Sequence, residues 1–150
     1  MSMIRTVSVV ATMLLLATVA CAQKPATSQS ENAASSPPQG LGSSREIMEA
    51  LTIPLSDAVF AAGSEAPKDD AQWLAVQRQA LALAESANLL LLPPRLVTTG
   101  SWVQWSVAQR DAAAVAMKAA QAKDGDALSR AADALYETCE GCHKVYLPSK

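Results

Sequence analysis

The chain has 150 residues, half of them apolar, which is enough for one domain with a hydrophobic core and too few for two. Its 12 basic and 14 acidic residues give a formal charge of −2 without any basic block, and this excludes a nucleic-acid-binding protein. With only three Trp, two Tyr and one Phe, the core would be thin for this length. We therefore expect something other than side chains to fill part of it.

Residues 1–22 are typical of an export signal. Arg5 precedes the apolar run VSVVATMLLLATVA, which is too short to span a bilayer comfortably and is followed by small residues. ATVAC resembles a bacterial lipobox, in which Cys21 would become the lipidated first residue, whereas ACA before Gln23 would suit ordinary signal peptidase. Because a leftover cysteine in an exported chain needs an explanation, we favour lipidation of Cys21.

Residues 23–43 are rich in Ser, Pro, Gln and Ala and contain almost no large apolar residue. This composition is typical of a flexible, disordered tether. A tether is what a domain with a lipid anchor in the membrane needs. We therefore expect a periplasmic lipoprotein anchored to the outer membrane.

Residues 44–150 are predicted to form one all-α domain, because no run alternates like a strand and good helix formers dominate. Three helix starts have the spacing of a capping box, namely Ser43 with Glu46, Asp69 with Gln72, and Ser101 with Gln104. Helix ends are predicted at Gly63, at Pro93 and Pro94, and around Gly125. Pro54 lies inside the first helix, where it should remove a hydrogen bond and bend the axis.

Apolar residues recur at steps of three and four in these segments, as on the buried face of a helix. The first seam comprises Met48, Leu51, Leu55, Val59 and Ala62, the second Trp73, Val76, Ala80, Leu83, Ala87 and Leu90, and the last Leu128, Ala132, Leu135, Cys139, Cys142 and Tyr146. Short connections between four helices of similar length favour an antiparallel up-down-up-down four-helix bundle.

The motif with specific chemistry is CEGCH, which contains the only histidine of the chain. Positions i, i+3 and i+4 share one helix face, so Cys139, Cys142 and His143 present two thiols and one imidazole to the same volume. Covalent attachment of haem c needs two thiols for the two vinyl groups and a neighbouring imidazole for the iron. Cys-x-x-Cys-His is the attachment signature of this cofactor.

Two other chemistries use the same residues. A structural disulfide or a thiol/disulfide oxidoreductase would suit an exported protein, but the redox motif is expected in a βαβ context, which the sequence does not indicate. Zinc needs three or four protein ligands. The processed chain has no further His, and Cys21 lies across the tether.

The segments EIMEALTIPLSDAVF, AQWLAVQRQALALAESANLLLLPPR and YETCEGCHKVY resemble exported bacterial cytochrome-like proteins. A four-helix bundle with CxxCH near the end of its last helix is similar to the cytochrome c prime family, over about residues 44–147. The resemblance implies His143 as an iron ligand and, as in low-spin members, a Met from the first helix. Leu147 stands where the family usually has a basic residue, which puts in doubt distal gas or proton chemistry that depends on it.

Helix levels in the predicted bundle indicate which methionine this is. Met48 lies about one turn from the start of its helix and His143 about one turn from the end of its own, so the two lie at similar heights. Met117 falls at the opposite end, and the other methionines leave with the signal. Met48 is therefore the candidate sixth ligand, the alternative being that it only fills the core, with Leu51 and Leu55 covering the sixth position.

The same levels place further residues around the haem, and Arg95 is the candidate partner of a propionate. Leu89–Leu92, Trp102 and Trp105 are expected to form walls. We expect an electron carrier rather than an enzyme, since His/Met ligation lets the iron change oxidation state with little rearrangement. The alternative is a five-coordinate haem protein that binds or senses a diatomic gas. The redox partner is not predicted, and pairing into a homodimer is left open.

Overall fold

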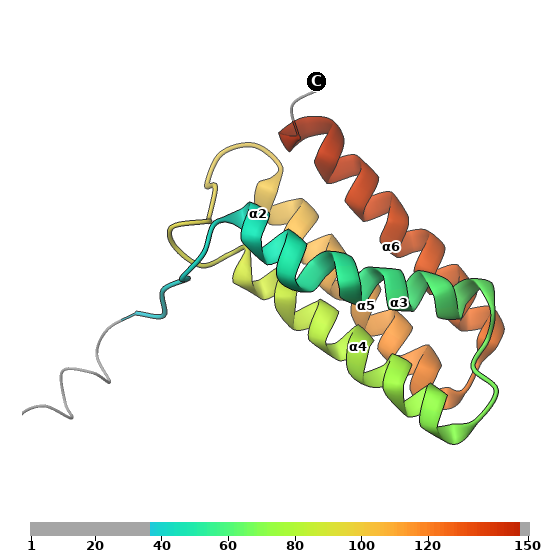
Figure 1. Ribbon diagram of the computed structural model, residues 1–150. Coiled ribbons are helices and arrows are strands. Elements are labelled where there is room, and N and C mark those ends of the chain that lie inside the picture. The colour runs from blue at the N-terminus through green and yellow to red at the C-terminus, as the bar shows by residue number, and fades with distance from the viewer. Residues whose placement is uncertain (1–36, 148–150) are drawn as a thin grey trace, which may run out of the picture. The chain divides into compact units, whose positions relative to one another are not determined.

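The computed structural model describes residues 37–147; the predicted signal, Cys21 and most of the tether lie outside this range. Within it, all regular structure is helical, which confirms the predicted all-α class. The elements are α2 (Ser44–Ile47), the π-helical turn η1 (Met48–Thr52), α3 (Ile53–Ser64), α4 (Asp70–Leu89), α5 (Trp102–Ala122) and α6 (Gly125–Tyr146) (Figure 1). No helix in these residues is long and apolar enough to cross a membrane.

The predicted helix starts are capped in two cases out of three. Ser43 Oγ accepts from the Glu46 N–H at 3.2 Å and Glu46 Oε2 accepts from the Ser43 N–H at 2.8 Å, which confirms this capping box. Asp69 caps α4 by accepting from the Gln72 N–H at 2.8 Å. The box at Ser101 is wrong, because the residue adopts φ −97° and ψ 12° and its side chain caps nothing. An N-cap needs extended backbone to aim its oxygen at the first turn.

The predicted helix end at KDGD, around Gly125, is confirmed, although Gly125 itself is not the residue that ends the helix. Helix α5 ends at Ala122, and Lys123 adopts the left-handed conformation with φ 55° that usually belongs to glycine. Gly125 is instead the first residue of α6, whose cap Asp124 accepts from the Ala127 N–H at 2.8 Å. Only Lys123 and Asp124 separate the two helices, so one residue ends α5 and the next starts α6. At the first helix, α3 ends at Ser64, one residue beyond Gly63.

The first helix runs through Pro54 with a local change of winding. The Ile53 N–H donates to the Met48 carbonyl, the i to i−5 bond of a π-helix. Pro54 has no N–H, and in a regular α-helix its ring would crowd the carbonyl of Ala50. The wider turn just before Pro54 relieves this conflict, so a π-helical turn takes the place of the simple bend that the sequence predicts.

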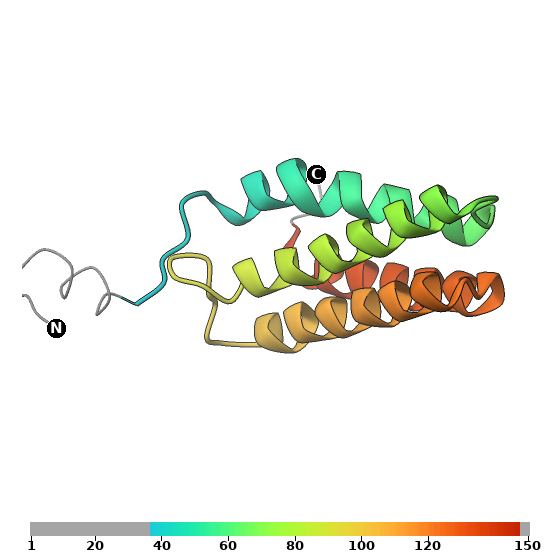
Figure 2. The same cartoon turned by 90° about the horizontal axis from the view of Figure 1, so that it is seen from below.

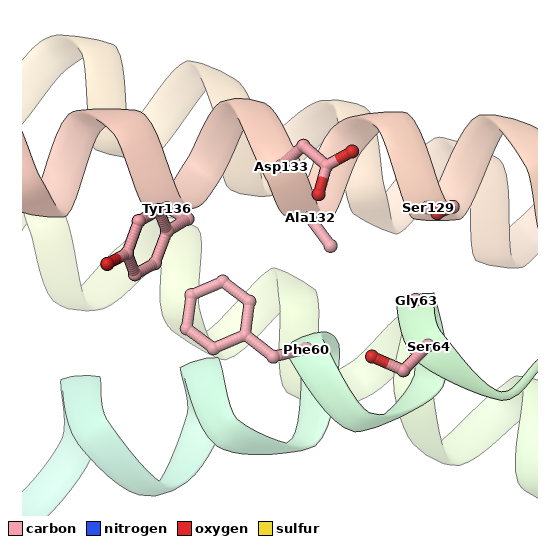
Figure 3. A pocket seen from close by; sticks show the side chains of 7 residues that line it. All are labelled: Phe60, Gly63, Ser64, Ser129, Ala132, Asp133 and Tyr136. Atoms are coloured by element: carbon pink, nitrogen blue, oxygen red, sulfur yellow. The ribbon is translucent and has the colours of Figure 1, made fainter.

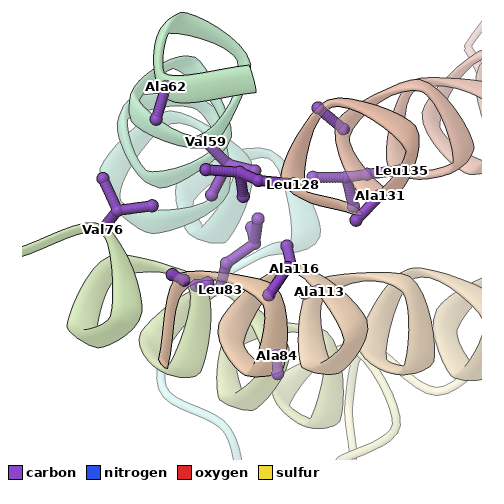
Figure 4. Close-up of a cluster of buried hydrophobic side chains, with 14 residues drawn as sticks. Val59, Ala62, Val76, Leu83, Ala84, Ala113, Ala116, Leu128, Ala131 and Leu135 are labelled. Atoms are coloured by element: carbon purple, nitrogen blue, oxygen red, sulfur yellow. The ribbon is translucent and has the colours of Figure 1, made fainter. Parts of the chain in front are cut away.

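The helices pack around one core. Helix α5 packs against α4 and α6, and α3 packs against the same two helices (Figures 1 and 2). Figure 4 shows the side chains that meet in the centre, with Val59 from α3, Leu83 from α4 and Leu128 and Leu135 from α6. Alanines supply most of the α5 contribution, which lets α5 approach its neighbours closely.

Candidate functional site at the end of the last helix

Helix α6 carries Cys139, Cys142 and His143 in its last two turns. Both cysteines are free thiols and partly buried, and His143 is exposed. The helix continues to Tyr146, and the Leu147 N–H donates to the His143 carbonyl at 3.0 Å. The three side chains thus have the helical spacing that the sequence predicts.

The two thiols are poorly suited to act as thiolates. Burial raises the pKa of Cys139, and burial followed by the neighbouring Cys139 raises the pKa of Cys142. Reactive cysteines have the opposite environment, with a lowered pKa. In addition, residues 37–147 contain no group of three or more His, Cys, Asp or Glu side chains placed to hold a metal ion. The raised pKa values of the two thiols thus do not favour thiol exchange.

Met48 and His143, which are predicted to lie at similar heights in the bundle, line one pocket. This pocket has a volume of about 190 Å³ and lies where the first helix, the start of α5 and the end of α6 meet. It is lined by Ser44, Arg45, Met48, Trp102, Cys142, His143, Tyr146 and Leu147. We call it the Met48–His143 pocket. It unites two candidate iron ligands and one attachment cysteine that come from opposite ends of the domain sequence.

A second, larger pocket of about 520 Å³ follows the face of α6 that carries Cys139. It is lined by Tyr136, Cys139, Glu140, His143, Lys144 and Leu147. His143 and Leu147 line both pockets, so the two hollows adjoin at the imidazole. Together they border both cysteines and His143.

The first helix and α6 touch at one end and separate toward the other (Figure 1). At the closed end the rings of Phe60 and Tyr136 meet edge to face with centroids 6.2 Å apart, and Gly63 lies against Ala132 (Figure 3). There the apolar seams are buried, with Val59 and Leu135 fully enclosed. Toward the open end, η1 packs against α4.

Side-chain burial follows this separation. On the first helix, Leu51 is 37% exposed, and Met48 and Leu55 are only partly buried. On α6, Cys139 and Cys142 are likewise only partly buried. The two apolar seams therefore lose protein contacts at the same end, which is the end that carries the CxxCH motif.

Trp102 forms the rigid floor of the Met48–His143 pocket. It is 8% exposed, its Nε1 donates to the Leu90 carbonyl at 3.0 Å, and its ring meets Tyr146 at 5.1 Å and 89°. The hydroxyl of Tyr146 lies over Gly100, whose φ of 71° requires glycine. Tyr146 had no assigned role from sequence. Through this contact, Tyr146 packs the last turn of α6 against the loop before α5.

Trp105 packs directly against Gly141, between the two cysteines, where any Cβ would collide with the indole ring. Its Nε1 and the Nε2 of Gln109, one turn along α5, are buried without a hydrogen-bond partner. Gln109 is only 6% exposed. The sequence singled out Trp105 but missed Gln109, because a polar residue on a mostly alanine helix gives no signal of burial.

Arg95 and the leucines before it lie elsewhere. The guanidinium of Arg95 donates from Nε to the Leu89 carbonyl at 2.7 Å and from Nη1 to the Gly42 carbonyl at 2.8 Å. The Met48–His143 pocket does not include it among its lining residues. Leu89 and Leu92 line a separate apolar pocket of about 340 Å³ together with Leu51 and Leu55.

The first residues of the folded part begin earlier than predicted. The Gly40 N–H donates to the Pro93 carbonyl at 2.7 Å, and Gly42 accepts from Arg95. The end of the predicted tether is therefore fixed to the loop between α4 and α5.

Comparison of this chain with protein families, curated proteins and solved structures finds no match.

Proposed function

We propose that the chain is a c-type cytochrome that carries electrons in the bacterial cell envelope. Cys139 and Cys142 would hold haem c covalently, and His143 and Met48 would ligate its iron. The observation that carries the proposal is the placement of Met48, Cys142 and His143 at one pocket, with Cys139 beside His143 in the adjoining one. The proposed architecture is the antiparallel up-down-up-down four-helix bundle.

The residues present fit a large planar apolar group. The adjoining pockets of about 190 and 520 Å³ are comparable to the roughly 300–1,000 Å³ of cofactor and ligand sites. The half-exposed seams around Met48 and Cys139 would be covered by such a group, which also accounts for the shortage of aromatic residues in the core.

Each cysteine contributes an S–H bond to the attachment. Haem would supply a vinyl double bond for each thiol, one carbon taking the sulfur and the other the hydrogen, so the attachment would need no external oxidant. The pair sits beside Gly141, whose missing side chain lets Trp105 support the helix there.

Bound haem would supply a one-electron change of oxidation state at its iron. Met48 and His143, the two residues that would ligate the iron, come from η1 and α6 and line the same pocket. Trp102 and Tyr146 restrict water on one side of the Met48–His143 pocket. A thioether donor opposite an imidazole raises the reduction potential, which suits an electron carrier.

The first test is covalent attachment. The full chain is produced in a host with cytochrome c maturation, denatured in acid and extracted with organic solvent. We expect the haem to remain with the wild-type polypeptide and to be extracted from Cys139→Ser/Cys142→Ser. Glu137→Gln, which changes an exposed residue of α6 two positions before Cys139, is the matched control and should keep its haem. Freely extractable haem in the wild type would refute the proposal.

The second test concerns the sixth ligand. The ferric wild type should be low-spin, with the weak sulfur-to-iron band in the far red. Met48→Ala should abolish this band, lower the potential and let the iron bind carbon monoxide. Met117→Ala, at the other end of α5, is the matched control. A five-coordinate, high-spin wild type would keep haem attachment but replace electron transfer by gas binding as the function.

The third test concerns the envelope location, which rests on the sequence alone. If Cys21 is acylated, the mature protein should partition into detergent, and Cys21→Ser should release it or block its processing. A wild type found wholly soluble in the periplasm, with Gln23 at its N-terminus, would contradict the anchor.

A further inference from the structure

Arg95 is a buried cation that holds two segments of backbone. It is 5% exposed, and its two donors reach the carbonyls of Leu89 at the end of α4 and Gly42 just before α2. Among residues 37–147, the salt bridges do not include Arg95. Its contacts are thus with neutral carbonyls that lie far apart in the sequence.

Gly40 completes this contact. A Cβ on Gly40 would collide with Nη1, Nη2 and Cζ of Arg95, so the guanidinium occupies the space that a side chain at position 40 would need. The Gly40 N–H donates to the Pro93 carbonyl at 2.7 Å, two residues before Arg95. We call Gly40, Gly42 and Arg95 the entry clamp, because they fix the chain where it enters the first helix.

The entry clamp is connected to Met48 through residues 43–47, which are held by backbone and capping hydrogen bonds. Ser43 follows Gly42 directly and caps α2 in a reciprocal box with Glu46. The Ile47 N–H donates to the Ser43 carbonyl at 3.1 Å, and Met48 is the next residue. This stretch has no loop that could absorb a displacement, so a shift of Gly42 moves Met48.

The same loop holds the opposite side of the pocket. Leu90, one residue beyond the Leu89 carbonyl that Arg95 binds, accepts from Nε1 of Trp102 at 3.0 Å. Trp102 meets Tyr146, in the turn of α6 that carries His143. Arg95 therefore lies where the segments that carry Met48 and support His143 are joined.

We propose that Arg95 is a positioning residue that sets the Met48 thioether at the distance from His143 needed for ligation of the same iron. This inference rests on the proposed function and extends it by a residue that touches no cofactor. Two separated carbonyls need the planar fork of arginine, which a lysine ammonium does not reproduce. The charge alone should therefore be insufficient.

The test uses the full chain with attached haem and the variants Arg95→Lys, Arg95→Met and Gly40→Ala. The two Arg95 variants lose the buried hydrogen bonds of the guanidinium, and Gly40→Ala forces the guanidinium aside. In each variant the ratio of six- to five-coordinate ferric iron should therefore fall by at least about tenfold. The far-red band should weaken and carbon monoxide binding should appear, as in Met48→Ala. Arg110→Lys, whose exposed side chain pairs with Asp111, is the matched control and should behave as wild type.

A second readout separates the clamp from the haem chemistry. Amide hydrogen exchange of residues 43–48 should accelerate in the Arg95 variants, and this is measurable in the chain with or without haem. If wild-type haem is extractable, the proposed function fails while the exchange still reports on the clamp. Wild-type iron coordination in Arg95→Lys or Arg95→Met would overturn the inference, even if the variant had a lower melting temperature. A high-spin wild type would also overturn it.

Discussion

At the scale of single residues, short-range geometry and packing act together around the site. CxxCH specifies its shared face by helical spacing alone. Gly141 and Trp105 meet because two helices approach closely, and this contact supports the turn between the cysteines. Glu46 acts on the site through local structure, because it completes the capping box at the start of the helix that leads to Met48.

Glu46 makes the start of α2 sensitive to pH. Hydrogen bonds from the Ser43 backbone and then from its side chain lower the pKa of Glu46 below its ordinary value of 4.5. A lowered folded pKa means that the stabilisation is fully present above pH 4.5 and is lost as the pH falls through the folded value. The Ser43 amide resonance should therefore titrate with a midpoint below 4.5, and this titration should vanish in Glu46→Gln. A midpoint at or above 4.5 would contradict the capping box as the cause.

At the scale of elements, the first helix and the contact of α5 with α6 decide where the proposed iron ligands, Met48 and His143, lie. The π-helical turn begins at Met48, and one extra residue in that turn changes the direction of every side chain before it. The close approach of α5 to α6 depends on a residue without a side chain at position 141.

Pro54→Ala should restore a regular α-helix by supplying the missing N–H. Loss of the extra residue per turn would rotate Met48 about the helix axis by about 100° relative to α3. We expect an unchanged or higher free energy of unfolding together with a loss of low-spin iron, measured by denaturant titration and ferric absorption. Ile53→Ala, at an exposed neighbouring position, is the control. A wild-type spectrum in Pro54→Ala would mean that the π-helical turn does not orient Met48.

Gly141→Ala and Gly63→Ala test the two ends of α6. Each adds a Cβ against a neighbour, the Trp105 ring at one end and Ala132 at the other. Overpacking costs about 1–3 kcal/mol, against a gain in helix propensity of up to about 1 kcal/mol, so both melting temperatures should fall or stay level. Only Gly141→Ala should also reduce the yield of covalently attached haem. Equal haem yields in the two variants would show that Trp105 does not support the attachment site.

At the scale of the whole molecule, the core is well filled at one end and open at the other. Val59, Leu128 and Leu135 are fully buried, whereas Met48, Cys139 and Cys142 are half-buried. Local stability follows the number of buried apolar contacts, so the two ends should differ in the rate at which their backbone opens.

Amide exchange of the chain without haem should therefore be slow at residues 56–62 and 128–135 and faster at residues 44–55 and 139–146. Attachment of haem should slow exchange selectively at the second set. It should also raise the melting temperature by at least about 4 °C, the shift that about 1 kcal/mol produces in a small domain. Uniform protection along the helices of the haem-free chain would refute this division.

Several features of the site could be predicted from the sequence because they depend on neighbours a few residues apart. The helical class, the cap at Ser43 and the common face of Cys139 and His143 follow from spacing within one segment. Met48 was identified by elimination, since the processed chain offers only one other methionine. The structure places it beside His143, and its ligation stays a prediction.

Other features depend on contacts between distant segments, and only the tertiary structure decided them. The clamp between Arg95 and Gly42 joins residues 53 positions apart, and Gly141 owes its importance to a ring from another helix. Ser101 caps nothing and Lys123 adopts the left-handed conformation usual for glycine, so the backbone angles at these two positions do not follow residue type. Local propensities amount to tenths of a kcal/mol to about 1 kcal/mol, whereas burial of whole helix faces contributes several, so packing prevails where the two conflict.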